Sequence, residues 1–120
     1  MEKENITRKI IKAAYEVHNN LKGGFQEVVY QRALAMELHA SGLEFSREAN
    51  IPVYYKGEKI DTRRVDFVIE DIIVEIKAKS LFDDSDFIQT LAYLKASGYK
   101  IALLINFGGK KVVVKRFING

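Results

Sequence analysis

The feature that most constrains the fold is a pair of apolar segments separated by two polar residues. Residues 67–69 read Phe-Val-Ile, residues 72–74 read Ile-Ile-Val, and Glu70-Asp71 lies between them. Two apolar runs joined by a short polar turn are typical of a β-hairpin. If Glu70-Asp71 is a two-residue loop, the residues next to it pair with each other, and every outward step pairs the next two positions. The hairpin therefore predicts which side chains share each face of the sheet.

This register brings three ionisable side chains to one face. Asp66 falls directly opposite Glu75, at a Cβ separation of roughly 4.5–5.5 Å, and Lys77 shares that face two residues further along. Two carboxylates at this distance repel by roughly 3 kcal/mol at an effective dielectric of 20. A proton, the lysine or a divalent cation must offset the repulsion, and oxygen-rich sites favour hard cations such as Mg²⁺ or Mn²⁺. The alternative is a salt-bridged patch on a solvated sheet face, in which Arg64 and Lys77 balance the acids. The other face is expected to be a core face and carries Val65, Phe67, Ile69, Val74, Ile76 and Ala78.

Composition limits the classes of protein to consider. A chain of 120 residues suits one domain with its own core, which we expect to span residues 1–120. No apolar run approaches the roughly 20 residues of a membrane span, and residues 1–5 do not resemble a signal peptide, so we expect a cytoplasmic protein. Without cysteine there are no disulfides or thiolate sites, and two histidines leave little room for a histidine-based zinc site. A net charge of +3 permits nucleic-acid binding without demonstrating it.

Periodicity predicts two helices, three strands, a third helix and two more strands. The expected helices are residues 5–21, 25–41 and 83–97, and the expected strands are residues 44–55, 59–69, 72–79, 100–107 and 111–118. The fold class is therefore α/β, a mixed sheet flanked by helices in the order ααβββαββ, with a right-handed parallel crossover through the third helix. Pro52 indicates an edge strand or a bulge. The expected core side of the third helix carries Phe87, Ile88, Leu91, Ala92 and Leu94.

Four helical side chains are further candidates for a site. Glu27 lies on the more apolar arc of the second helix, where a carboxylate is costly unless it is paired or binds a metal; its alternative role is interaction with the helix dipole. Tyr30 shares that side of the helix, and a packed aromatic is its favoured role. Gln89 and Tyr93 are one helical turn apart, but periodicity points Gln89 away from the core, so it can line a site only along the wall of a cleft.

Taken together, these segments resemble a known family. Residues 24–30 read Gly-Phe-Gln-Glu-Val-Val-Tyr, which resembles the signature of the small GxxExxY proteins. The similarity continues in order over nearly the whole chain, through Arg64-Val65-Asp66-Phe67, Val74-Glu75-Ile76-Lys77-Ala78, Gln89-Thr90-Leu91-Ala92-Tyr93-Leu94-Lys95 and Leu103-Leu104-Ile105-Asn106-Phe107. One departure is Lys22, where the family usually has glycine. The family in turn resembles the PD-(D/E)XK nuclease superfamily, which implies a restriction-endonuclease-like fold.

The resemblance implies a role for each candidate. Asp66 matches the motif aspartate, Glu75 the following acid and Lys77 the lysine. Glu27 matches an acid supplied by an early helix. Asp66, Glu75 and the Ile76 carbonyl would bind Mg²⁺ or Mn²⁺, and Glu27 would hold a water, the same metal or a second metal. Lys77 would orient or deprotonate the attacking water, or stabilise developing negative charge.

Other residues are expected to contact the substrate. Gln89 and Tyr93 match a QxxxY element of related exonucleases, and Tyr30 and Arg64 complete the candidate substrate contacts. The wider set of candidate phosphate contacts is Lys9, Lys12, Arg47, Arg63, Arg64, Lys79 and Lys95. The expected activity is metal-dependent hydrolysis of phosphodiester bonds in nucleic acid, with DNA favoured over RNA. The alternatives are a catalytically inactive nucleic-acid-binding or assembly module of the same fold, and a homodimeric resolvase-like enzyme.

Overall fold

The computed structural model describes residues 3–120; residues 1 and 2 of the N-terminal segment considered above lie outside the described part. The elements are α1 (Lys3–Leu21), α2 (Glu27–Ala40), β1 (Ser46–Tyr55), β2 (Glu58–Ile69), β3 (Ile72–Lys77), α3 (Asp84–Ser97), β4 (Ile101–Asn106) and β5 (Val113–Ile118). This is the predicted order, ααβββαββ, with ends that differ from the predicted ones by a few residues. Within residues 3–120, no helix has the length and apolarity needed to span a membrane.

The strands form one mixed sheet in the order β1-β2-β3-β4-β5. β3 and β4 are parallel and the other neighbours are antiparallel, so the predicted parallel crossover through α3 is confirmed. The hairpin register is also confirmed, because Ile69 pairs with Ile72 and Phe67 with Val74. Pro52 lies on β1 at the edge of the sheet, next to a bulge between Val53 and Tyr54.

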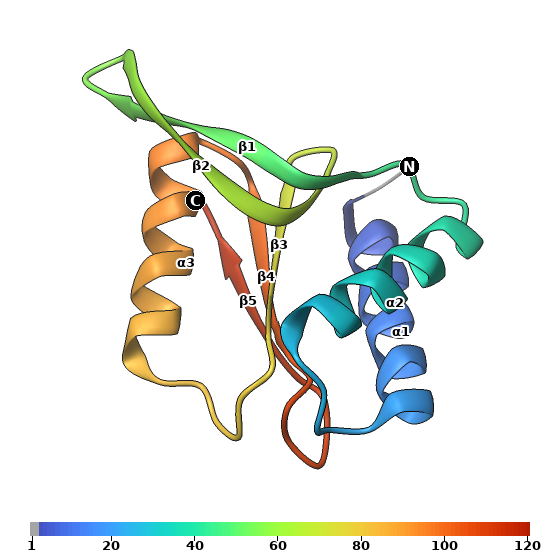
Figure 1. Cartoon of the computed structure of the whole chain (residues 1–120). Coiled ribbons are helices and arrows are strands. Elements are labelled where there is room, and N and C mark those ends of the chain that lie inside the picture. Colours follow the sequence, from blue (N-terminus) through green and yellow to red (C-terminus); the bar gives the residue numbers. More distant parts are fainter. Residues whose placement is uncertain (1–2) are drawn as a thin grey trace.

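Helices cover both faces of the sheet, with α1 and α2 on one side and α3 on the other (Figure 1). The larger core cluster joins α1 and α2 to side chains such as Phe67 and Val74. The smaller cluster joins α3 to the opposite face and includes Val65 and Ile73. The prediction that Val65 shares a face with Phe67 is therefore wrong. β1 is irregular at this step, because Glu48, which lies between Arg47 (paired with Phe67) and Ala49 (paired with Val65), has a left-handed backbone conformation (φ 47°).

α3 presents to the sheet a different side from the predicted one. Its buried residues are Asp86, Thr90, Leu94 and Ser97. Of the expected core side, Ile88 and Leu91 are 68% and 38% exposed and Ala92 is also exposed, so these three assignments are wrong. Polar residues tolerate burial here because they find partners: Lys79 Nζ donates to the Asp86 carboxylate, and the Thr90 hydroxyl donates to the Asp86 carbonyl.

Candidate active site

The candidate site begins where β2 and β3 separate. Their backbone pairing ends at Phe67 and Val74, and side chains replace the backbone acceptors beyond it. The Asp66 N–H donates to Glu75 Oε1 at 2.8 Å, and the Ile76 N–H donates to Asp66 Oδ2 at 2.8 Å. Each acid therefore accepts a backbone hydrogen bond from the strand that carries the other acid. This reciprocal arrangement holds the two carboxylates side by side, as the hairpin register predicts.

Burial makes this acid pair electrostatically costly. Glu75 is only 9% exposed, and Asp66 is half-buried. Loss of solvation raises the pKa of Glu75 to about 8, with a further upward contribution from the charge of Asp66 and an opposing one from Lys77. In the part of the chain that the structure describes, no ion pair joins Asp66 or Glu75 to a basic side chain. The alternative of a salt-bridged, solvated patch balanced by Arg64 and Lys77 is therefore wrong.

A buried glutamine from α2 supports Asp66. Gln31 Nε2 donates to Asp66 Oδ1 at 2.9 Å, and Arg47 Nη2 on β1 donates to Gln31 Oε1 at 2.9 Å. Gln31 is buried, so this chain of hydrogen bonds orients the carboxylate from a packed helix. Gln31 is absent from the residues predicted from the sequence. The signal that could have found it is a polar residue one turn after Glu27 on the buried side of α2.

Glu27 is the first residue of α2 and lies near the acid pair. Partial burial raises the pKa of Glu27, the positive charge of Lys77 lowers it, and the negative charge of Asp66 raises it again. These mutual effects place its carboxylate within electrostatic range of both residues. Across residues 3–120, however, no three His, Cys, Asp or Glu side chains lie close enough together to hold a metal ion. The acid pair is thus a two-carboxylate cluster with a third acid nearby.

Lys77 ends β3, beside Asn106 of β4. It is half-buried, and its charge lowers the pKa of both Glu75 and Glu27. A single ammonium therefore acts on acids that come from a strand and from a helix. Two adjacent carboxylates, a third carboxylate and a lysine thus surround the point where β2 leaves β3.

Comparison with known proteins assigns the chain to a family. A model of the PD-(D/E)XK nuclease superfamily matches residues 4–117. The chain belongs to that superfamily. The mixed five-stranded sheet with flanking helices is the restriction-endonuclease-like arrangement expected of it. The solved structure of SSO0001 is similar, with a TM-score of 0.47 and 13% sequence identity over 95% of this chain and 77% of that one. No curated protein matches the sequence.

Nucleases of the PD-(D/E)XK superfamily generally use divalent metal ions, and the donor set fits such an ion. Asp66, Glu75 and the Ile76 carbonyl supply only hard oxygen donors. Mg²⁺ commonly keeps several waters and needs only one or two protein carboxylates. The raised pKa of Glu75 also indicates a buried acid that lacks sufficient positive charge around it. With two carboxylates, the donor set thus fits a cation that keeps several of its waters better than it fits a cation whose ligands all come from the protein.

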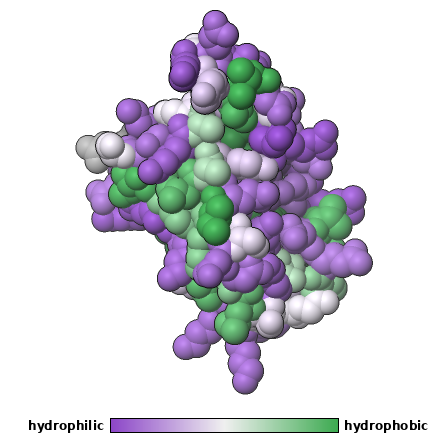
Figure 2. Space-filling model, turned by 90° about the vertical axis from the view of Figure 1, so that its left-hand side faces the viewer, coloured by the Kyte–Doolittle hydropathy of each residue, from purple (hydrophilic) through white to green (hydrophobic). Residues whose placement is uncertain are grey.

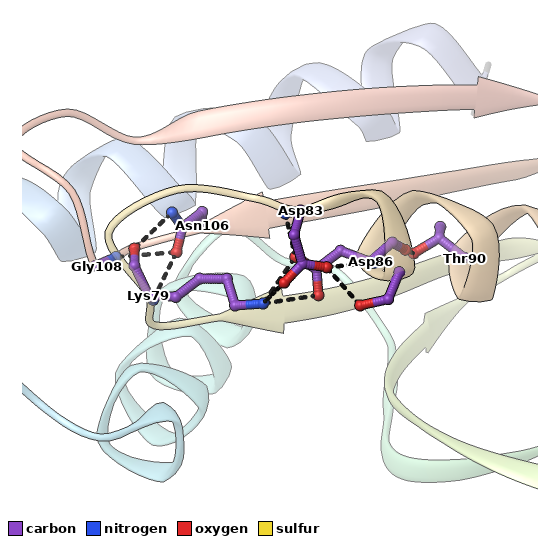
Figure 3. A network of polar contacts seen from close by, with 7 residues as sticks. Lys79, Asp83, Asp86, Thr90, Asn106 and Gly108 are labelled. Atoms are coloured by element: carbon purple, nitrogen blue, oxygen red, sulfur yellow. Dashed lines mark hydrogen bonds and ion pairs between the residues drawn. The ribbon is translucent and has the colours of Figure 1, made fainter.

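The segment after Lys77 is held by a second polar network (Figure 3). Lys79 Nζ contacts Asp83 Oδ2 and Asp86 Oδ2, both at 2.9 Å, at the start of α3. Asn106 Nδ2 donates to the Lys79 carbonyl at 2.8 Å, and Asn106 Oδ1 accepts from the N–H groups of Lys79 and Gly108 at 3.1 Å. A Cβ on Gly108 would collide with the Lys79 backbone, so this close approach requires glycine. The network fixes the exit of the strand that carries Glu75 and Lys77 in this nuclease fold.

Tyr30 has a structural position. It is fully buried and stacks on Phe107 with ring centroids 4.9 Å apart. Its hydroxyl donates to the Lys22 carbonyl and accepts from the Phe25 N–H at 3.2 Å. Tyr30 is thus the packed aromatic that its helical position favoured, with no surface to offer a substrate, and it shapes the loop that leads to Glu27.

The remaining candidate substrate residues lie outside this hydrogen-bond network. Gln89 is exposed on α3, and Tyr93 is half-buried against the smaller core cluster. Arg64 is exposed on β2, two residues before Asp66. Among residues 3–120, no hydrogen bond joins any of the three to Asp66 or Glu75. Among the described residues, charge effects on pKa link Glu27 and Lys77 to the acid pair, and no such effect links Gln89, Tyr93 or Arg64 to it.

Three of the basic residues predicted to contact phosphate are engaged within the protein. Arg47 binds Gln31, Arg63 Nη1 lies 2.7 Å from Asp61 Oδ2, and Lys79 binds Asp83 and Asp86. The charges of Arg63 and Lys79 are therefore already partly compensated before any nucleic acid arrives, and the hydrogen bond to Gln31 fixes the guanidinium of Arg47. Lys9, Lys12, Arg64 and Lys95 remain candidates for phosphate contact, as their sequence positions predict.

Proposed function

We propose that the chain is a metal-dependent nuclease that hydrolyses phosphodiester bonds, with DNA as the favoured substrate. One observation carries this proposal: reciprocal backbone hydrogen bonds lock Asp66 and Glu75 together although, within residues 3–120, no ion pair joins either acid to a basic side chain. A pair that served stability alone would be expected to have a basic partner, because uncompensated buried carboxylates are costly. The superfamily membership makes phosphodiester hydrolysis the chemistry that such a pair would serve.

The proposal assigns the metal ligands and the residues around them. Asp66, Glu75 and the Ile76 carbonyl would hold Mg²⁺ or Mn²⁺, with Gln31 keeping Asp66 oriented. Such a cation supplies charge neutralisation at the phosphate and lowers the pKa of water. Lys77 orients the attacking water, accepts its proton, or stabilises negative charge as it develops on the phosphate. Glu27 binds a water molecule at the edge of the site, since it lies apart from the two-carboxylate cluster.

The proposed substrate contacts are taken from the sequence motifs. Gln89 and Tyr93 on α3 would contact the nucleic-acid strand, and Arg64 would contact a phosphate from β2. We propose, on the residue 24–30 motif, that the chain is a GxxExxY protein, and we assign Tyr30 to the positioning of the Glu27 loop. We also propose that residues 1–120 act as a single domain and that the protein works in the cytoplasm.

The test is a cleavage assay on single- and double-stranded DNA and RNA with Mg²⁺ or Mn²⁺. Cleavage should require the metal and should disappear in Asp66→Ala, Glu75→Ala and Lys77→Ala. Glu44→Ala is the matched control, because Glu44 is an exposed acid outside the acid pair. Full cleavage by the Asp66 and Lys77 variants would refute the residue roles. Oligonucleotide binding without turnover across all metals would favour the inactive binding module instead.

A further inference from the structure

We propose that α3 is a dimerisation helix that pairs in antiparallel orientation with α3 of a second copy of this chain. The first observation is where the apolar residues of the helix lie. Its buried residues are Asp86, Thr90, Leu94 and Ser97, only one of which is apolar, whereas Ile88 and Leu91 are exposed. Large apolar residues exposed on the side of a helix that faces away from the sheet indicate a second packing surface.

The outward side forms a narrow stripe. Asp84, Ile88, Leu91 and Lys95 follow one another at spacings of four, three and four residues, and all four are exposed. At 100° per residue they fall within an arc of about 60°. Figure 2 views the molecule from the side on which α3 lies, and apolar side chains run as a broken band down the middle of this face between hydrophilic margins.

The stripe is complementary to the same stripe of a second copy when the two helices run antiparallel. The spacing from Asp84 to Ile88 equals that from Leu91 to Lys95. A two-fold axis between positions 89 and 90 therefore sets Asp84 level with the second copy's Lys95, and Ile88 level with the second copy's Leu91. Each contact then occurs twice, as a self-complementary two-fold interface requires. Because an acid meets a base at both ends, charge favours this antiparallel register and opposes a parallel one.

Both charges are available for such pairing. Lys79 engages Asp83 and Asp86 in the network of Figure 3, but not Asp84. In residues 3–120, neither Asp84 nor Lys95 takes part in an ion pair. Beside the stripe, Phe87 packs between Phe82 and Phe117 at centroid distances of 5.5 and 6.4 Å. This aromatic cluster extends the apolar surface beyond α3. A second copy is the occupant that the matched apolar and charged positions specify.

Sedimentation equilibrium of the full chain tests the proposal. The wild-type protein should form dimers with a dissociation constant of about micromolar, as small interfaces do. Ile88→Lys should raise that constant by on the order of 100-fold, because it buries two lysines at the centre of the interface. Met36→Lys is the matched control, since Met36 is 73% exposed on α2, and it should leave the dimer unchanged.

Exchanging the charges of Asp84 and Lys95 tests whether these residues pair across the dimer interface or only affect folding. Asp84→Lys and Lys95→Asp should each weaken the dimer about tenfold, because each places two like-charged pairs across the axis. The double variant should restore the wild-type constant, and circular dichroism should show that all variants are folded. A monomeric wild-type protein, a dimer indifferent to Ile88→Lys, or a double variant no better than the singles would overturn the proposal. Binding of a different protein to the stripe of a monomer would overturn it as well.

Discussion

Two carboxylate pairs, one that joins β2 to β3 and one at the start of α3, differ in how their charge is compensated. Asp83 and Asp86 share the ammonium of Lys79, and together they cap the first turn of α3. In the described part of the chain, the hydrogen-bond donors to Asp66 and Glu75 are two backbone N–H groups and the Gln31 side chain. The Ser85 hydroxyl, together with Lys79, lowers the pKa of Asp83, whereas burial raises the pKa of Glu75. The first pair stabilises the start of α3, and the second is the pair that we propose binds a cation.

The largest effect that separates the two pairs should be on catalysis. Glu75→Gln keeps the shape of the side chain but removes its charge, so we expect metal-dependent cleavage to fall by about 10²–10³-fold or more. Asp86→Asn makes the same chemical change in the compensated pair and should retain most of the activity. Rates measured at saturating Mg²⁺ compare the two. Equal losses of activity in the two variants would show that Asp66–Glu75 and Asp83–Asp86 do not differ in their role in catalysis.

The support of Asp66 by Gln31 predicts a smaller effect of the same kind. Gln31→Ala removes the donor to Asp66 Oδ1, and groups that orient metal ligands commonly contribute about 10–100-fold to affinity or activity. The Mg²⁺ concentration for half-maximal activity should rise accordingly. Gln26→Ala is the control, because Gln26 precedes α2 without a side-chain capping hydrogen bond. An unchanged Mg²⁺ requirement would remove Gln31 from the site.

The two pairs should also respond oppositely to pH. Because the pKa of Glu75 rises from 4.5 to about 8, the folded protein binds more protons than the unfolded chain between those values. The free energy of unfolding of the metal-free protein should therefore fall as pH rises through this window. A tenfold difference in proton affinity between the folded and unfolded states corresponds to about 1.4 kcal/mol, so we expect a loss of at least that size. Urea unfolding at several pH values should show this slope, and Glu75→Gln should flatten it.

For the Asp83–Asp86 pair, we expect the opposite dependence: the free energy of unfolding should fall as pH decreases in the acid range. The lowered pKa of Asp83 adds stability above its ordinary value of 3.8, and this stability is lost as pH falls below that value. Asp83→Asn should therefore reduce the sensitivity of unfolding to pH in this acid range without altering the neutral-pH slope. If the neutral slope changed instead, the assignment of that slope to Glu75 would fail.

The smallest expected effect is on stability alone. Asp86→Ala removes the reciprocal cap of α3 and one partner of Lys79, so we expect a loss of about 1–2 kcal/mol in the free energy of unfolding. Asp84→Ala is the control, since Asp84 lies in the same turn outside this network. Thermal unfolding compares the two variants. Similar losses would mean that general acidity at the helix start, rather than the Lys79 network, stabilises α3.

Local pattern was enough to predict that Asp66 and Glu75 lie next to each other. The alternation of side chains in a strand has a period of two, and the turn at Glu70-Asp71 sets which residues pair. Together these rules place Asp66 opposite Glu75, and the structure joins the two by hydrogen bonds. The same periodicities yield the order of helices and strands and the edge position of Pro52. These features depend on neighbours in the sequence or across a two-residue turn.

Contacts between distant segments decided the rest. Gln31 is connected to the site only because α2 packs against the start of the β2–β3 divergence, 35 residues away from Asp66 in the chain. The orientation of α3 could not be read from hydrophobicity, since its polar residues become inexpensive to bury once Lys79 supplies a partner to Asp86. Burial of Glu75, and hence its raised pKa, likewise depends on the packed fold rather than on its neighbours in the sequence. The sequence alone determined the pairing of the two acids, because local backbone geometry sets it. Only the tertiary structure decided which charges are compensated, because that depends on the groups the fold brings alongside them.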